Sequence, residues 1–180
     1  MSGDCRVLLI GMMGSGKSTI GRLLSEATGW PYHDNDELVE RAHGISSRAL
    51  LAERGRDVMR RAESDALSLG LDLPPPAIIG VAGGVIVDED DRRALTSGGI
   101  VVWLRTAAVV LAERAKGADH RPFLEGDAVE WMADALAERE PLYGSVADVV
   151  LQTDAESAES AVSRLTAWLA ARDACRPYLV

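Results

Sequence analysis

The sequence predicts an α/β fold in which a five-stranded parallel sheet is covered by helices on both faces. Short apolar runs of strand type alternate with longer amphipathic segments along the 180 residues, and this alternation is typical of parallel sheets with helical crossovers. A glycine-rich turn, GMMGSGKS, also joins the first strand directly to the first helix. With 47% hydrophobic and 26% charged residues, residues 1–180 are expected to form one soluble domain.

The expected elements follow one another in a regular order. An apolar run at residues 6–10 predicts the first strand, and apolar residues that recur on one face between residues 20 and 27 predict the helix after it. Three prolines at residues 74–76 are expected to end a helix and introduce a strand. We therefore expect strands near residues 5–10, 31–34, 77–81, 100–104 and 148–151, and helices near residues 17–28, 36–43, 46–53, 56–70, 88–97, 106–116, 126–140 and 155–171.

The turn after the first strand reads G-x-x-x-x-G-K-S from Gly11 to Ser18. Its glycines permit backbone angles and close approaches that a side chain would block, so backbone N–H groups and the positive end of the helix can converge on an anion. Lys17 would reach the β- and γ-phosphates of a nucleotide, and the Ser18 hydroxyl would bind Mg²⁺. The alternative is a turn that only joins strand to helix. A strand before it and a helix after it favour a site for a nucleoside triphosphate.

Composition and charge exclude several kinds of partner. A net charge of −9 and a pI of about 4.8 argue against a broad nucleic-acid surface. No apolar run approaches about 18 residues and no basic stretch opens the chain, so neither a membrane span nor a secretory signal is expected. Cys5 and Cys175 are interpreted as reduced thiols of a cytoplasmic protein, without metal-ligand spacing. A monomer is the default expectation.

Two aspartates are the candidates for the acidic part of the site. Regulatory GTPases are excluded, because the only asparagine, Asn35, is not part of an N-K-x-D element and no D-x-x-G follows the loop. Asp34 and Asp36 fall where the second strand runs into a helix, at the sheet edge where ligands bind in parallel sheets. Capping of the helix is the alternative role. Beside a phosphate loop that lacks another acid, a role in binding metal or substrate is favoured.

Six short motifs together resemble the shikimate kinase family. They are GMMGSGKST, DND, RRAE at Arg60–Glu63, AGG at Ala82–Gly84, RPF at Arg121–Phe123 and REPLY at Arg139–Tyr143, and they span roughly residues 5–170. Each motif except the loop is weak alone, but six in the family's order are specific. The resemblance implies a three-layer P-loop NTPase fold of the nucleoside-monophosphate-kinase type. It also implies a substrate-binding helical subdomain at about residues 34–63 and a lid at about residues 116–125.

The activity that the resemblance implies is transfer of the γ-phosphate of ATP to the 3-hydroxyl of shikimate. Mg²⁺ would be bound by Ser18 and, through a water molecule, by Asp34. Arg114 would lie near the adenine. The phosphates of ATP would be held by Gly14, Ser15, Gly16, Lys17, Ser18 and Thr19.

The acceptor would be a small hydroxylated carboxylic acid. Asp36 would bind its hydroxyls and orient or deprotonate the attacking one, while Arg121 on the lid would close over the transferring phosphoryl group. Arginines suit the carboxylate because they bind it through two parallel hydrogen bonds. A solvated helix face and a charged loop are the alternatives for Arg60 and Arg121. The acceptor's carboxylate would be bound by Arg60, Arg139 and the backbone N–H groups of Gly83 and Gly84.

Several residues depart from the family pattern, mostly in the part that binds the acceptor. Ala82 stands where the family usually has a glycine, and Ser47 where it prefers a bulky apolar residue. Residues 49, 51, 56 and 59 also differ. Two other interpretations therefore stay open: a related kinase that phosphorylates another hydroxy acid or a cyclitol, and a regulatory relative that binds ATP without transferring phosphate.

Overall fold

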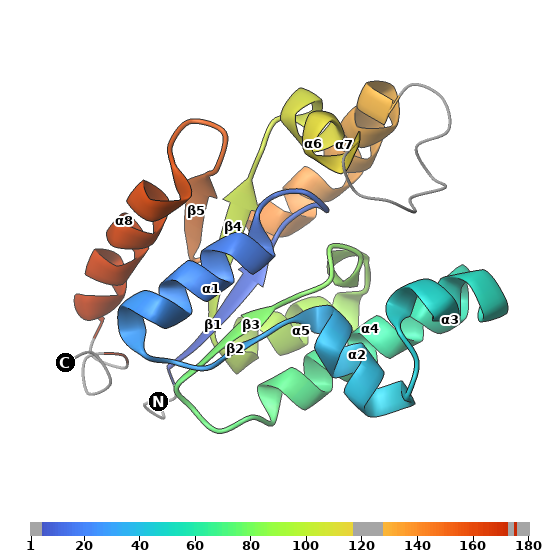
Figure 1. The fold of residues 1–180 in the computed structure, drawn as a ribbon, viewed down its shortest axis with the longest axis horizontal. Helices are drawn as coiled ribbons and strands as arrows, with labels where there is room; N and C mark the ends of the chain where they lie inside the picture. The colour runs from blue at the N-terminus through green and yellow to red at the C-terminus, as the bar shows by residue number, and fades with distance from the viewer. Residues whose placement is uncertain (1–4, 117–127, 173–174, 176–180) are drawn as a thin grey trace.

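The computed structural model describes residues 5–116, 128–172 and 175, and within them one sheet lies between two layers of helices (Figure 1). The strands are β1 (Arg6–Ile10), β2 (Tyr32–His33), β3 (Ala77–Gly80), β4 (Ile100–Arg105) and β5 (Val149–Gln152). Their order is β2-β3-β1-β4-β5, and every neighbouring pair is parallel. The predicted five-stranded parallel sheet is confirmed.

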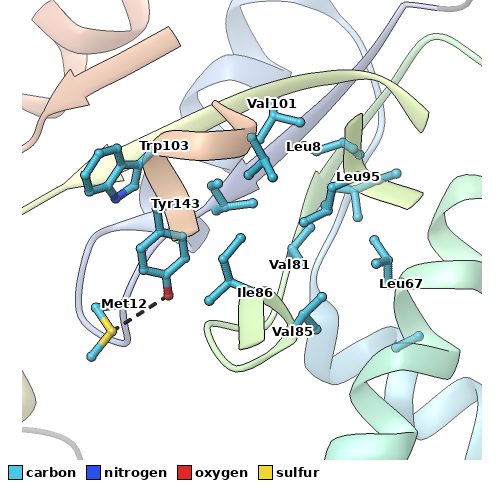
Figure 2. Close-up of a cluster of buried hydrophobic side chains, with 14 of the residues drawn as sticks. Leu8, Met12, Leu67, Val81, Val85, Ile86, Leu95, Val101, Trp103 and Tyr143 are labelled. Atoms are coloured by element: carbon cyan, nitrogen blue, oxygen red, sulfur yellow. Dashed lines mark hydrogen bonds between the residues drawn. The ribbon is translucent and has the colours of Figure 1, made fainter. Parts of the chain in front are cut away.

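Alternate residues of β1 face opposite layers. Val7 and Leu9 pack in the hydrophobic cluster that includes α1 and α8, while Leu8 and Ile10 pack in the cluster that includes α4, α5 and α7 (Figure 2). Both clusters are buried, as expected for a central parallel strand. The helices are α1 (Lys17–Thr28), α2 (Asn35–His43), α3 (Ser47–Arg54), α4 (Arg56–Leu71), α5 (Glu89–Gly98), α6 (Ala108–Lys116), α7 (Ala128–Val146) and α8 (Ala158–Ala170), with a 3₁₀ turn η1 (Val85–Val87).

Helix α7 extends further than the sequence pattern indicates. The prediction ended it near residue 140. Pro141 follows, and a proline disfavours a helix because it has no N–H to donate to the preceding turn and its ring crowds that turn. In the structure the helix continues through Pro141 to Val146. Tyr143 and Val146, beyond the proline, are both buried in the core, so packing of the last turn outweighs the local cost of the proline.

The interpretation of the cysteines as reduced thiols was wrong. The Sγ atoms of Cys5 and Cys175 are joined in a disulfide, and the two Cα atoms lie 5.0 Å apart. Cys5 immediately precedes β1, and Cys175 lies in a turn after α8. These segments meet because α8 packs on α1. Residues of both helices and of β1 share one hydrophobic cluster with Cys5 and Cys175. The sequence alone did not indicate this contact, because the two cysteines are 170 positions apart.

Among the described residues, no helix is long and apolar enough to cross a membrane. The expectations of a monomer, of a cytoplasmic location and of no nucleic-acid partner stay predictions, as do the boundaries of the substrate-binding subdomain and the lid.

Candidate active site

A cavity of about 820 Å³ opens beyond the carboxyl ends of β1, β2 and β3. Ligands bind at this edge of a parallel sheet because the loops that follow the strands converge there. The phosphate loop lines one part of the cavity, and residues from α2, α4, α7 and the turn after β3 line another. The candidate residues that line it are Gly14, Ser15, Gly16, Lys17, Ser18, Thr19, Asp34, Asp36, Arg60, Gly83, Gly84, Arg114 and Arg139.

The phosphate loop depends on its glycines. Gly11, Gly14 and Gly16 have φ angles of +141°, +82° and +98°, in the region that residues with a side chain rarely adopt. The ammonium of Lys17 donates to the carbonyl of Gly11 at 2.9 Å and to that of Met12 at 3.0 Å. These contacts fold the lysine over its own loop, with its charge beside the space that the loop encloses.

Ser18 and Asp34 form the pair proposed to bind a metal. The Ser18 hydroxyl donates to Asp34 Oδ2 at 2.9 Å, and the Tyr32 hydroxyl donates to the same oxygen at 2.8 Å. Asp34 Oδ1 also accepts from the Asp36 N–H, so Asp34 caps α2 as well. Burial disfavours the Asp34 carboxylate, but hydrogen bonds from Tyr32, Asp36 and Ser18 outweigh it and hold the pKa of Asp34 below its usual value.

This pair fits Mg²⁺ in character. Mg²⁺ is usually bound by one or two carboxylates, with substrate phosphates and water completing its six positions. Within the described ranges no group of three or more histidine, cysteine, aspartate or glutamate side chains could hold a metal. A nucleotide-bound ion beside Ser18 and the ionised Asp34 does not need such a cage.

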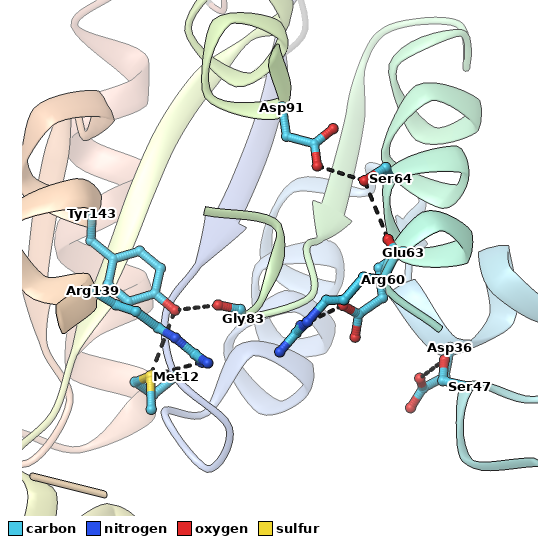
Figure 3. A network of polar contacts seen from close by, with 10 residues as sticks. All are labelled: Met12, Asp36, Ser47, Arg60, Glu63, Ser64, Gly83, Asp91, Arg139 and Tyr143. Atoms are coloured by element: carbon cyan, nitrogen blue, oxygen red, sulfur yellow. Dashed lines mark hydrogen bonds and ion pairs between the residues drawn. The ribbon is translucent and has the colours of Figure 1, made fainter. Parts of the chain in front are cut away.

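Two arginines from different helices approach the same part of the cavity. Figure 3 shows the side chains of Arg60, from α4, and Arg139, from α7, pointing toward one another. Arg60 Nη1 lies 2.6 Å from Glu63 Oε2. Arg139 Nη1 contacts the Met12 sulfur at 3.6 Å, and its buried Nε has no hydrogen-bond partner among the described residues. Arg139 thus retains donor capacity inside the site.

Glu63 is the buried counter-ion of Arg60. It is only 8% exposed, and its carboxylate accepts from Arg60. Burial raises the pKa of Glu63, although the guanidinium of Arg60 opposes this effect. The pair fixes the Arg60 side chain in the cavity, since a buried charge is stable only beside its partner.

Asp36 is exposed at the start of α2 and is held from its far side by Ser47. The Ser47 hydroxyl donates to Asp36 Oδ1 at 2.8 Å (Figure 3). Ser47 does not line the cavity, whereas Asp36 does. The second carboxylate oxygen of Asp36 is therefore the one better placed to accept a hydrogen bond from a ligand.

Arg114 lies beside the phosphate loop, away from the paired arginines. It donates to the carbonyl of Thr153 at 2.8 Å and to that of Gly14 at 3.3 Å. Thr153 in turn donates to the carbonyl of Ser15 at 3.0 Å. These bonds connect α6, the segment after β5 and the phosphate loop.

Comparisons with known proteins agree with this geometry. A model of the shikimate kinase family matches residues 13–170. The chain belongs to the shikimate kinase family. A shikimate kinase of Nitratidesulfovibrio vulgaris is 40% identical over 92% of this chain and 96% of its own length. One from Moorella thermoacetica is 36% identical over 91% and 95%.

A solved structure extends the likeness to three dimensions. The shikimate kinase from Acinetobacter baumannii in complex with shikimate superimposes with a TM-score of 0.83 at 28% identity, over 89% of this chain and 90% of that one. The P-loop kinase fold expected from the motifs is therefore confirmed. Arg121 and residues 117–125 of the expected lid lie outside the described residues.

Three residues that contact the site were not predicted from the sequence. They are Tyr32, Glu63 and Tyr143, which contact Asp34, Arg60 and Gly83 respectively. Glu63 and Tyr143 lie inside the motifs RRAE and REPLY, so the motifs did contain the signal. The spacing of three between Arg60 and Glu63 would also place them on one helix face. No comparable pattern marks Tyr32.

Proposed function

We propose that the chain is an ATP-dependent shikimate kinase, which transfers the γ-phosphate of ATP to the 3-hydroxyl of shikimate. The observation that carries the proposal is that Arg60, Arg139 and Asp36 line the same cavity as a phosphate-binding loop. Two arginines match a carboxylate, and an aspartate matches hydroxyl donors. An acceptor with its acid at one end and hydroxyls at the other fits this layout. The related enzyme of A. baumannii was solved in complex with shikimate, which supports the same acceptor here.

In this proposal the phosphate loop positions ATP. Backbone N–H groups of residues 14–19 hold the phosphates, and Lys17 turns from the loop carbonyls that it contacts now toward the phosphate oxygens. Mg²⁺, held by Ser18 and Asp34, would neutralise charge on the β- and γ-phosphates when bound. Arg114 contacts the base from its position beside Thr153, and Arg121 is assigned the role of closing over the γ-phosphate.

The acceptor side supplies orientation and a base. Arg60, Arg139 and the Gly83–Gly84 backbone bind the carboxylate, while Asp36 accepts hydrogen bonds from the hydroxyls. The attacking hydroxyl oxygen forms a bond to the γ-phosphorus as the bond to the β,γ-bridging oxygen breaks, and the hydroxyl proton passes to Asp36. ADP is the leaving group. Most of the rate enhancement comes from positioning and charge neutralisation.

Two features of the acceptor end favour a second candidate, a kinase of another hydroxy acid or of a cyclitol. Ser47 bonds to Asp36, where the family prefers an apolar residue. Ala82 lines the cavity with a methyl group, where the family usually has glycine. Ser47 changes the polarity beside Asp36, and Ala82 adds a methyl group to the cavity lining.

A coupled assay of ADP release, with and without shikimate, tests the proposal. Turnover that requires shikimate supports it. Turnover with related hydroxy acids but none with shikimate favours the second candidate, and ATP binding without any turnover indicates a regulatory relative. Lys17→Met, purified in the same way, is the control for contaminating kinases, because loss of this cation should slow turnover by at least about 100-fold.

A further inference from the structure

A buried tyrosine holds the turn that contains Gly83 and Gly84, directly after β3. Tyr143, on α7, is 1% exposed, and its hydroxyl donates to the Gly83 carbonyl at 2.8 Å (Figure 3). Its ring stacks on Trp103 of β4 with centroids 5.7 Å apart. The Met12 sulfur lies 3.7 Å from the same hydroxyl, but sulfur is the weaker acceptor. The single hydroxyl proton is therefore directed to Gly83.

The backbone that Tyr143 holds has two orientations open to it. Gly83 and Gly84 have no side chains, so the peptide plane between them can rotate with little steric cost. Rotation would exchange the directions of the Gly83 carbonyl and the Gly84 N–H. Both glycines line the cavity, and within the described chain neither N–H group donates to another residue. An anion in the cavity would gain from an N–H and be repelled by a carbonyl.

The hydrogen bond from Tyr143 selects one of these orientations. In a trans peptide the C=O and the following N–H point in opposite directions. Figure 3 shows Arg60 on the side of Gly83 opposite Tyr143. Because the Gly83 carbonyl is directed at Tyr143, the Gly84 N–H must be directed away from Tyr143, toward the side of Arg60. Gly84 is in contact with that arginine, because a Cβ placed on it would lie 1.1 Å from Arg60 Nη1.

We propose that Tyr143 is a positioning residue, whose hydroxyl holds the Gly83–Gly84 peptide with its N–H toward the acceptor's carboxylate. This inference rests on the proposed function, because it assigns the carboxylate to this end of the cavity. Tyr143 does not line the cavity itself. It acts through the peptide, and it stays a neutral donor because burial raises its pKa.

Tyr143→Phe isolates this role. The variant keeps the ring that stacks on Trp103 and removes only the donor. We expect the KM for shikimate to rise about tenfold or more, the usual effect of losing a hydrogen bond to a charged group, while the KM for ATP stays the same. Preference for shikimate over its neutral methyl ester should fall by a similar factor, because the N–H gains most from a full negative charge.

Ser145→Ala is the matched control. It removes an exposed hydroxyl from the same helix, one that donates only to the Leu142 carbonyl, and it should leave both constants unchanged. A merely structural role of Tyr143 would lower Tm, or reduce activity toward acid and ester alike, without changing their ratio.

Three outcomes are informative. A reduced acid-to-ester ratio in Tyr143→Phe, with folding intact by circular dichroism, supports the inference. An unchanged ratio overturns it, whatever happens to Tm. If the wild type itself does not phosphorylate shikimate, the proposed function fails first; calorimetric binding of shikimate to wild type and variant then decides the role of Tyr143 separately.

Discussion

The guanidinium of Arg60 occupies the space that any side chain at Gly84 would need. A Cβ built on Gly84 would lie 1.1 Å from Arg60 Nη1 and 1.9 Å from its Cζ. The φ angle of Gly84 is −89°, so its backbone does not require glycine. Glycine is needed at this position instead because Arg60 approaches so closely. Gly84 therefore makes room for Arg60, which together with Arg139 forms the pair that we call the carboxylate clamp.

Gly84→Ala should therefore impair the site by displacing the Arg60 side chain. The methyl group displaces the guanidinium from Glu63 and from the cavity, and we expect the KM for shikimate to rise at least about tenfold, since one charge-assisted contact is lost. The KM for ATP should stay the same. Steady-state kinetics with each substrate varied in turn measures both.

Gly144→Ala is the control for that variant. A Cβ there would meet nothing closer than a Trp103 ring carbon at 3.9 Å, and alanine favours the helix. It should leave kinetics unchanged and raise Tm slightly. Wild-type KM in Gly84→Ala would mean that Arg60 moves without losing its function.

The pH dependence of stability should report on Glu63. Burial raises the pKa of this carboxyl above its ordinary value of 4.5, despite the opposing effect of Arg60. The folded protein therefore binds the Glu63 proton more tightly than the unfolded chain does. Stability from this group falls as pH rises from about 4.5 through the raised native pKa, and is constant above it.

Glu63→Gln removes this titration. We expect the difference in unfolding free energy, variant minus wild type, to increase with pH across that window in urea titrations. Glu53→Gln, at an exposed position on α3, is the matched control for the loss of one carboxylate. A difference that falls with pH would show that the attraction of Arg60 exceeds the cost of burial.

Sequence patterns predicted the sheet and the phosphate loop well because both depend on local properties. The apolar run at residues 6–10 lies within the strand that it predicts, and the positive φ angles of Gly14 and Gly16 favour glycine at these positions. The end of α7 was missed because burial of Tyr143 outweighs the effect of Pro141. The end of α7 is therefore determined by tertiary packing, which a local sequence pattern does not reveal.

The candidate site divides in the same way. The family resemblance implied that Arg60 and Arg139 bind one carboxylate, and both arginines line one cavity. The contacts that hold them could not be read from sequence, because the Met12 sulfur approaches Arg139 from 127 residues away. The disulfide was missed for a similar reason, since pairing of Cys5 with Cys175 depends on where α8 packs.

Reduction of the disulfide should destabilise the protein. Both cysteines are fully buried and the bond links residues 170 positions apart, so it restricts nearly the whole unfolded chain. Removing it should lower the unfolding free energy by about 2–4 kcal/mol. Chemical unfolding with and without dithiothreitol measures the loss.

A double variant, Cys5→Ala with Cys175→Ala, provides the comparison. It should match the reduced wild type and be insensitive to dithiothreitol. Kinetic constants should change little in either case, because neither cysteine lines the cavity. Equal stability of oxidised and reduced wild type would contradict the prediction.

The carboxylate clamp can be tested by removing each arginine in turn. Arg60→Ala and Arg139→Ala each delete one charge-assisted contact, worth roughly 1.5–3 kcal/mol. This corresponds to a loss of about 10- to 150-fold in kcat/KM for shikimate. Arg61→Ala is the matched control, because Arg61 is the exposed neighbour on α4 and does not line the cavity.

Comparison of shikimate with its methyl ester separates the clamp from general damage to the site. Wild type should prefer the acid, and both arginine variants should lose most of that preference, whereas Arg61→Ala should keep it. Asp36→Asn should instead lower kcat for both compounds, because an amide keeps the size of the side chain but cannot accept the hydroxyl proton. If wild type uses acid and ester equally, the two arginines do not bind a carboxylate. A neutral polyol then becomes the better acceptor, since Asp36 would still bind its hydroxyls.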